Sequence, residues 1–161
     1  MIEKLKKVLD EHKEEYLGYL KDVIKIDTQD IGHGILGGRE LEGQKYLEKL
    51  MKSMGAQVKK EAVTEDTIQD GIKKYYEGNP GHNYKDRYNL ISTFKGEGGK
   101  SIVFDGHIDT MPPGDLKFWN TDPFEPTIKD GKIYGLGSAD MKGGLMAAVM
   151  AVKLLKDAGI K

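Results

Sequence analysis

The sequence places a histidine and an aspartate two residues apart, His107 and Asp109, after an apolar run that begins at Ile102. If this run is a β-strand, its period of two puts both side chains on one face. A carboxylate beside an imidazole can accept the second ring N–H, fix the tautomer and support a metal-ligating histidine. The pattern is compatible with a metal ligand at His107, although by itself it does not favour one. The alternative is a strand-end histidine that bonds to a neighbouring loop.

A second carboxylate, Asp140, lies in a glycine-rich stretch just before an apolar helical pattern. An isolated aspartate in this place is typical of a helix N-cap or a first-turn acid that the helix dipole stabilises. A carboxylate can also use its two oxygens to bridge two cations, and the nearby glycines allow backbone and metal to approach closely. Both interpretations remain open on the residues alone.

Two phosphate-binding motifs can be excluded, so no nucleotide cofactor is expected. The run Gly98-Gly99-Lys100-Ser101 lacks the first glycine of a P-loop, because Phe94 occupies that position,. The pair Gly135 and Gly137 would require a third glycine where Asp140 stands,. The chain has no cysteine, which excludes a thiolate zinc site and a cysteine nucleophile,.

Apolar spacing and turn residues predict the elements that position these side chains. The pattern indicates an α/β fold. Residues 64–87 are polar and rich in turn formers, so we expect them to be an excursion over the surface. The predicted helices cover residues 2–24 and 41–54 and start again at 143, and the predicted strands cover residues 56–63, 89–95, 100–105, 126–129 and 132–134, the last four as two hairpins,.

The balance of charge and the length limit the classes of partner. The 161 residues include 25 Lys plus Arg against 26 Asp plus Glu. We therefore expect neither a nucleic acid nor an anionic membrane surface as a partner. The length suits one domain, and no secretory signal follows Met1, so we expect a cytoplasmic protein.

Several ordered motifs together resemble the N-terminal part of M20-type metallohydrolases, the group of acetylornithine deacetylase, succinyl-diaminopimelate desuccinylase and carboxypeptidase G2. The resemblance is dense from about residue 90 to 158 and looser through the first two helices. It rests on the motifs Gly106-His107-Ile108-Asp109-Thr110, Trp119, Asp122-Pro123-Phe124, Asp130 to Gly135, and Asp140-Met141-Lys142-Gly143-Gly144.

The resemblance implies a zinc-peptidase-like catalytic domain, with a mixed sheet flanked by helices, and a role for each candidate residue. His107 would ligate one zinc ion, Asp140 would bridge two, and Asp109 would act in catalysis by orienting His107. The implied cofactor is zinc, two ions for each complete site, with cobalt or manganese as substitutes. The implied reaction is hydrolysis of an amide bond in an N-acyl amino acid or small peptide by a metal-activated water. The full-length protein is expected to be a homodimer.

The same resemblance implies that residues 1–161 are only the N-terminal portion of the catalytic domain. The family's general base belongs to a Glu-Glu pair well beyond Asp140, and the lid or dimerisation domain and the later ligands have no counterpart here. Glu14-Glu15 lies on the charged face of the first helix, so we reject it as the base. The chain alone is therefore expected to be inactive. Two alternatives remain: a non-catalytic binding or assembly module, and a half-enzyme that a second chain completes.

Overall fold

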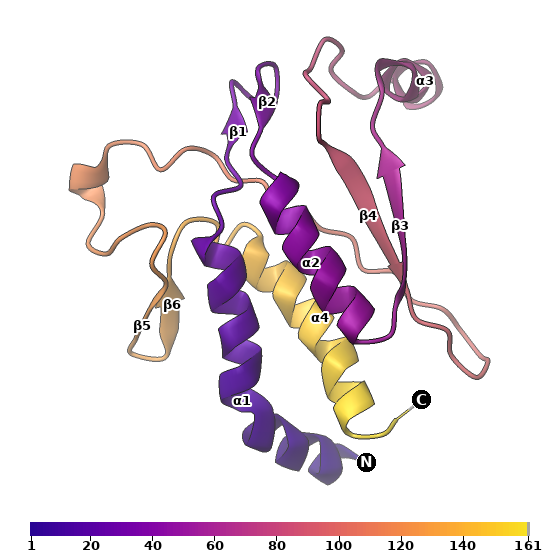
Figure 1. Cartoon of the computed structure of the whole chain (residues 1–161), viewed down its shortest axis with the longest axis vertical. Coiled ribbons are helices and arrows are strands. Elements are labelled where there is room, and N and C mark those ends of the chain that lie inside the picture. Colours follow the sequence, from indigo (N-terminus) through magenta and orange to yellow (C-terminus); the bar gives the residue numbers. More distant parts are fainter. Residues whose placement is uncertain (161) are drawn as a thin grey trace. The chain divides into compact units, whose positions relative to one another are not determined.

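A computed structural model describes residues 1–160, and its helices and strands confirm the α/β class. Among the described residues the strands form three separate two-stranded sheets, all antiparallel. The elements, labelled in Figure 1, are α1 (Ile2–Lys25), β1 (Asp30–Ile31), β2 (Gly37–Gly38), α2 (Leu41–Ser53), β3 (Gln57–Ala62), α3 (Glu65–Tyr75), β4 (Tyr88–Thr93), η1 (Leu116–Phe118), β5 (Thr127–Lys129), β6 (Lys132–Tyr134) and α4 (Lys142–Asp157).

The chain divides into two compact units. The first contains residues 1–26, 95–108 and 113–161, and the second contains residues 27–94 and 109–112. In the first unit, α1 packs on α4, and the two helices lie side by side in Figure 1. Apolar residues recur on one face of α1, as the spacing predicts,. The buried apolar side chains of α1, of α4 and of its C-cap residue form the core of the unit: Tyr16, Val23, Ile24, Met146, Val149 and Ala158.

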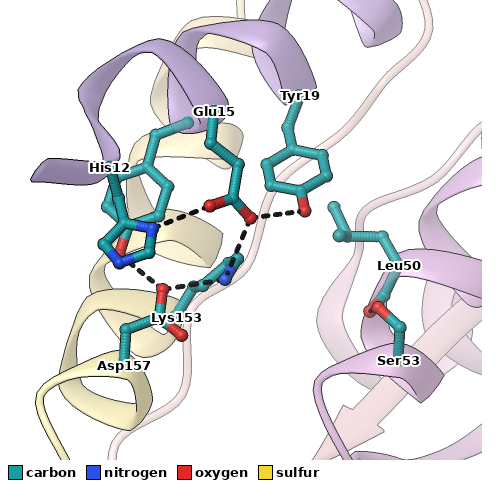
Figure 2. Close-up of polar contacts among 8 residues, drawn as sticks. His12, Glu15, Tyr19, Leu50, Ser53, Lys153 and Asp157 are labelled. Carbon is teal, nitrogen blue, oxygen red and sulfur yellow. Dashed lines mark hydrogen bonds and ion pairs between the residues drawn. The ribbon is translucent and has the colours of Figure 1, made fainter.

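A polar cluster joins α1 to α4 beside this core. Figure 2 shows Lys153 of α4 between two carboxylates, and its Nζ lies 3.2 Å from Glu15 and 2.8 Å from Asp157. The hydroxyl of Tyr16 donates to Asp157 at 2.7 Å, and that of Tyr19 donates to Glu15 at 2.8 Å. His12 contacts the other oxygen of Glu15 at 2.8 Å. We call these six residues the α1–α4 cluster.

The cluster shifts the pKa of its acids in one direction. Burial raises the pKa of Asp157, but the hydrogen bonds from Lys153 and Tyr16 outweigh it, so the pKa is lowered on balance,. The hydrogen bonds from His12 and Tyr19 likewise lower the pKa of Glu15. The pKa of Tyr16 is raised, first by burial and then by the hydrogen bond to Asp157. The folded chain therefore favours ionised carboxylates and a neutral phenol.

These shifts predict how stability depends on pH. Since the folded chain lowers the pKa of Asp157, this residue stabilises the fold above the pKa of the unfolded chain, about 4, and that contribution is lost as the pH falls through the folded pKa,. Asp157→Asn should therefore flatten the acid side of a plot of melting temperature against pH, measured by circular dichroism between about pH 5 and 2. Parallel curves for wild type and variant would contradict the role of the cluster.

The second unit packs α2 on the β3–β4 sheet. The two strands pair over six residues, from Gln57 opposite Thr93 to Ala62 opposite Tyr88. Leu47, Leu50 and Met54 are buried on the α2 side. Gly55 follows the helix with a φ of 85°, which confirms the left-handed C-cap expected from the sequence,.

The predicted hairpin of residues 89–95 and 100–105 is wrong. The first of these segments pairs with β3 instead, and residues 100–105 form no strand. Ile102, Val103 and Phe104 are exposed, at 75%, 86% and 52%. Their β-branched and aromatic side chains have a high propensity for strands. This propensity is not enough to form a strand here, because no strand among residues 1–160 pairs with the segment,.

The predicted surface excursion at residues 64–87 contains a helix that the composition did not reveal. Thr64 caps α3, because its hydroxyl accepts a hydrogen bond from the backbone of Thr67 at 3.2 Å. Glu65 and Asp66 follow in the first turn, where the helix dipole favours acids,. None of the α3 residues is buried, so the helix does lie on the surface.

The second predicted hairpin is confirmed. The strands β5 and β6 flank Asp130 and Gly131, which have φ angles of 52° and 71°. Positive values at both residues define the tight turn that this dipeptide favours. Within residues 1–160, no helix has the length and apolar character needed to cross a membrane.

Candidate metal centre

The structure brings His107 and Asp140 into contact, although they are 33 positions apart in the sequence. The His107 Nε2 atom lies 3.1 Å from the Asp140 Oδ1 atom. Their side chains are 45% and 87% exposed. An imidazole nitrogen and a carboxylate oxygen are therefore adjacent and open to a cation from solvent.

The backbone around Asp140 is held in a compact turn between β6 and α4. Gly137 starts the turn with a φ of 74°. Its carbonyl accepts a hydrogen bond from the backbone of Lys142 at 2.9 Å. A Cβ at Gly143 would lie 2.3 Å from the carbonyl oxygen of Ser138, so the turn can close only with glycine at this position. The peptide bond from Asp140 to Met141 is cis.

Asp140 does not cap α4. The N-cap residue is Met141, and no side chain makes a capping hydrogen bond there. The carboxylate is instead directed to His107, where the two side chains form the contact described above. The helix-cap interpretation of Asp140 is therefore wrong, which leaves this carboxylate for another role.

The segment that carries His107 packs against the start of α4. A Cβ at Gly106 would lie 3.1 Å from Met141 Cε and 3.2 Å from Leu145 Cδ1. The backbone at Gly106 therefore lies directly against these two side chains. This packing holds the neighbouring His107 next to the turn of Asp140.

Asp109 belongs to the second unit and is half-buried. Its neighbours Ile108 and Thr110 are 5% and 4% exposed, whereas His107 is much more open. This alternation is the one expected of an extended chain, although residues 107–109 are not part of a strand,. Thr110 is fixed by backbone hydrogen bonds to Thr28 and Asp30, at 3.1 and 2.9 Å. The orienting role of Asp109 stays a prediction.

The chemistry of the donor pair fits a zinc ion in part. Imidazole nitrogen and carboxylate oxygen are both common zinc donors, but a zinc site normally has three or four protein ligands. Among residues 1–160, no group of three or more His, Cys, Asp or Glu side chains could hold a metal ion. His107 and Asp140 could thus supply two ligands of a larger set. Glu15 lies in the α1–α4 cluster, and its rejection as the catalytic base stays a prediction.

Comparison with known proteins extends this picture. The model of peptidase family M20/M25/M40 matches residues 103–161, which include His107, Asp109 and Asp140. The whole chain also superposes on human carnosine dipeptidase 1, with a TM-score of 0.69 and 24% identity. It superposes on the dipeptidase Dug1p of Saccharomyces cerevisiae with a TM-score of 0.77 and 17% identity.

In both comparisons the alignment covers 100% of this chain and 32% of the other, so the chain spans about a third of the length of these structures. At these identities the two superpositions establish the fold. The match to the family model adds a similarity in sequence over the segment that contains the candidate ligands His107 and Asp140. Over residues 103–161 the chain is therefore similar in sequence to the peptidases of family M20/M25/M40, and its fold is similar to that of the two dipeptidase structures.

Proposed function

We propose that this chain is part of a metal-dependent hydrolase that cleaves an amide bond in a small peptide or N-acyl amino acid. The single observation that carries the proposal is the contact between His107 and Asp140 at 3.1 Å. These two residues match the metal-ligand positions implied by the resemblance, and they lie in the segment that the family model covers. The dipeptidases named for both solved structures favour a small peptide as the substrate class.

In this proposal His107 and Asp140 hold zinc, with cobalt or manganese as substitutes. The bound metal would supply Lewis-acid polarisation of the amide carbonyl and a water of lowered pKa. His107 would contribute an imidazole nitrogen, and in the role that the resemblance implies, Asp109 would accept the other ring N–H and so keep the ring in the required tautomer. Asp140 contributes an anionic carboxylate with two oxygens, which suits a bridge between two ions.

The remaining ligands and the general base must come from outside this donor pair. We propose that they belong to further polypeptide, either a continuation of this chain or a second chain. The fragment of 161 residues is then inactive by itself. The homodimer and the cytoplasmic location expected from the sequence stay predictions.

Hydrolysis of dipeptides by a protein that contains this segment tests the proposal. Activity should disappear after treatment with a chelator and return with zinc. Asp109→Asn should retain part of the metal and lower activity by about 10- to 100-fold, the usual cost of losing the partner of a metal-ligating histidine. Full activity and full metal content in Asp109→Asn would show that the orienting role is wrong. An absence of hydrolysis in the complete, zinc-loaded protein would favour the non-catalytic module.

A further inference from the structure

Among residues 1–160, Lys142 is the largest side chain that is fully buried, with 1% of its surface exposed. Lysine is almost never buried to this degree without partners, because its ammonium loses hydration. The Nζ atom donates a hydrogen bond to the backbone carbonyl of Ile26 at 2.9 Å. The burial of this charge two residues after Asp140 therefore requires an explanation.

The acceptor lies at the end of a helix. Ile26 is the C-cap residue of α1, and the carbonyls at a helix C-terminus lack partners within the helix and carry its negative dipole end,. A buried ammonium is favoured there by charge as well as by hydrogen bonding. Ile24, two residues before the C-cap, is fully buried, so this end of α1 is held in the core.

The backbone of Lys142 is fixed at the same time. Its N–H donates to the carbonyl of Gly137 at 2.9 Å, which closes the turn that contains Asp140. The side chain of Asp140 is 87% exposed, so few packed neighbours restrain it. Its position opposite His107 must therefore be set mainly by the backbone of the turn. Lys142 therefore ties this turn to the end of α1 through the hydrogen bond to Ile26.

We infer that Lys142 is a positioning residue: its buried ammonium anchors the turn of Asp140 to the carbonyl end of α1 and thereby holds the Asp140 carboxylate opposite His107. The inference that this arrangement serves metal binding rests on the proposed function. The arrangement itself does not, because it concerns two side chains of the metal-free chain.

NMR spectroscopy of the whole metal-free chain tests the inference. Wild type should show a nuclear Overhauser effect between the ring protons of His107 and the β protons of Asp140, because the ring Nε2 atom lies 3.1 Å from the carboxylate Oδ1 atom. Lys142→Met, which removes the charge but keeps the length of the side chain, should lose this signal. The glutamine side chain in Lys142→Gln is polar but too short to reach the carbonyl of Ile26. This variant should also lose the signal, and it provides a second test if Lys142→Met does not fold. Lys142→Arg keeps a cationic donor and should retain the signal.

Val149→Ala is the control, because Val149 is buried on the same helix but lies outside the turn. It should lower the melting temperature and keep the signal. If the signal persists in Lys142→Met or Lys142→Gln, or disappears in Lys142→Arg or Val149→Ala, the inference is overturned.

A zinc titration of the same samples separates the two claims. Loss of the Lys142 anchor should weaken zinc binding at His107 by about 10- to 100-fold, as with other groups that orient metal ligands. If wild type shows the His107–Asp140 signal but no zinc effect at His107, the proposed function fails while the positioning role stands.

Discussion

His107→Ala is expected to reduce the proposed zinc-dependent hydrolysis by more than about 100-fold in a protein that carries this segment. The variant would remove a proposed metal ligand, whereas loss of an orienting partner alone costs about 10- to 100-fold. The metal content should fall with the activity. The fold should persist, since the side chain is 45% exposed and contributes little to the core. Metal analysis and dipeptide hydrolysis on the same preparation measure both effects.

His82→Ala provides the matched control for this variant. His82 is a half-buried histidine whose ring packs edge-on against Tyr84, with ring centroids 6.2 Å apart. It lies outside the candidate metal centre, so its loss should leave metal content and hydrolysis close to wild type. Equal losses in the two variants would mean that His107 has no special role.

Gly143→Ala is expected to destabilise the fold by about 2–3 kcal/mol, the upper part of the usual cost of overpacking. The added Cβ would lie 2.3 Å from the carbonyl oxygen of Ser138, which is a backbone atom and cannot rotate away. The turn that carries Asp140 must then open. Urea unfolding measures the loss of stability, and a fall in zinc affinity should accompany it.

The adjacent glycine gives a sharp comparison. A Cβ at Gly144 would meet Met141 Cε at 3.7 Å, which is an ordinary contact. Gly144→Ala should therefore be neutral or stabilise the chain by up to about 1 kcal/mol, because alanine is the better helix former. If both variants cost the same free energy, the close approach at Gly143 is not what shapes the turn.

The sequence correctly predicted the elements whose signals lie within a few neighbouring residues. The apolar spacing of α1 and the Asp130-Gly131 turn of the β5–β6 hairpin are complete signals within a few residues, and both are confirmed. The strand pairing of β4 is different. The glycine-rich segment after β4 suggested a hairpin with residues 100–105. The actual partner of β4 is β3, and Gln57 pairs with Thr93, which lies 36 positions later in the sequence. No local pattern specifies such a pairing.

The candidate site, too, could be predicted from the sequence only in part. The residue types at His107, Asp109 and Asp140 suggested metal chemistry, but only the fold brings His107 to Asp140. The role of Lys142 could not be predicted from composition, because lysine is normally exposed and the acceptor, Ile26, is 116 residues away,. A lysine directly before two glycines at the start of an apolar helix was the one available signal.

The central claim, that His107 and Asp140 bind the same metal ion, is tested most directly by titrating the chain with zinc and observing the imidazole nitrogens by NMR. The chain has four histidines, His12, His33, His82 and His107. We expect zinc to shift the His107 Nε2 resonance. The binding should be weak, because two ligands are fewer than a zinc site normally has, and Asp140→Ala should reduce the apparent affinity further. A zinc effect confined to the other three histidines, or an affinity at His107 that Asp140→Ala leaves unchanged, would contradict the central claim.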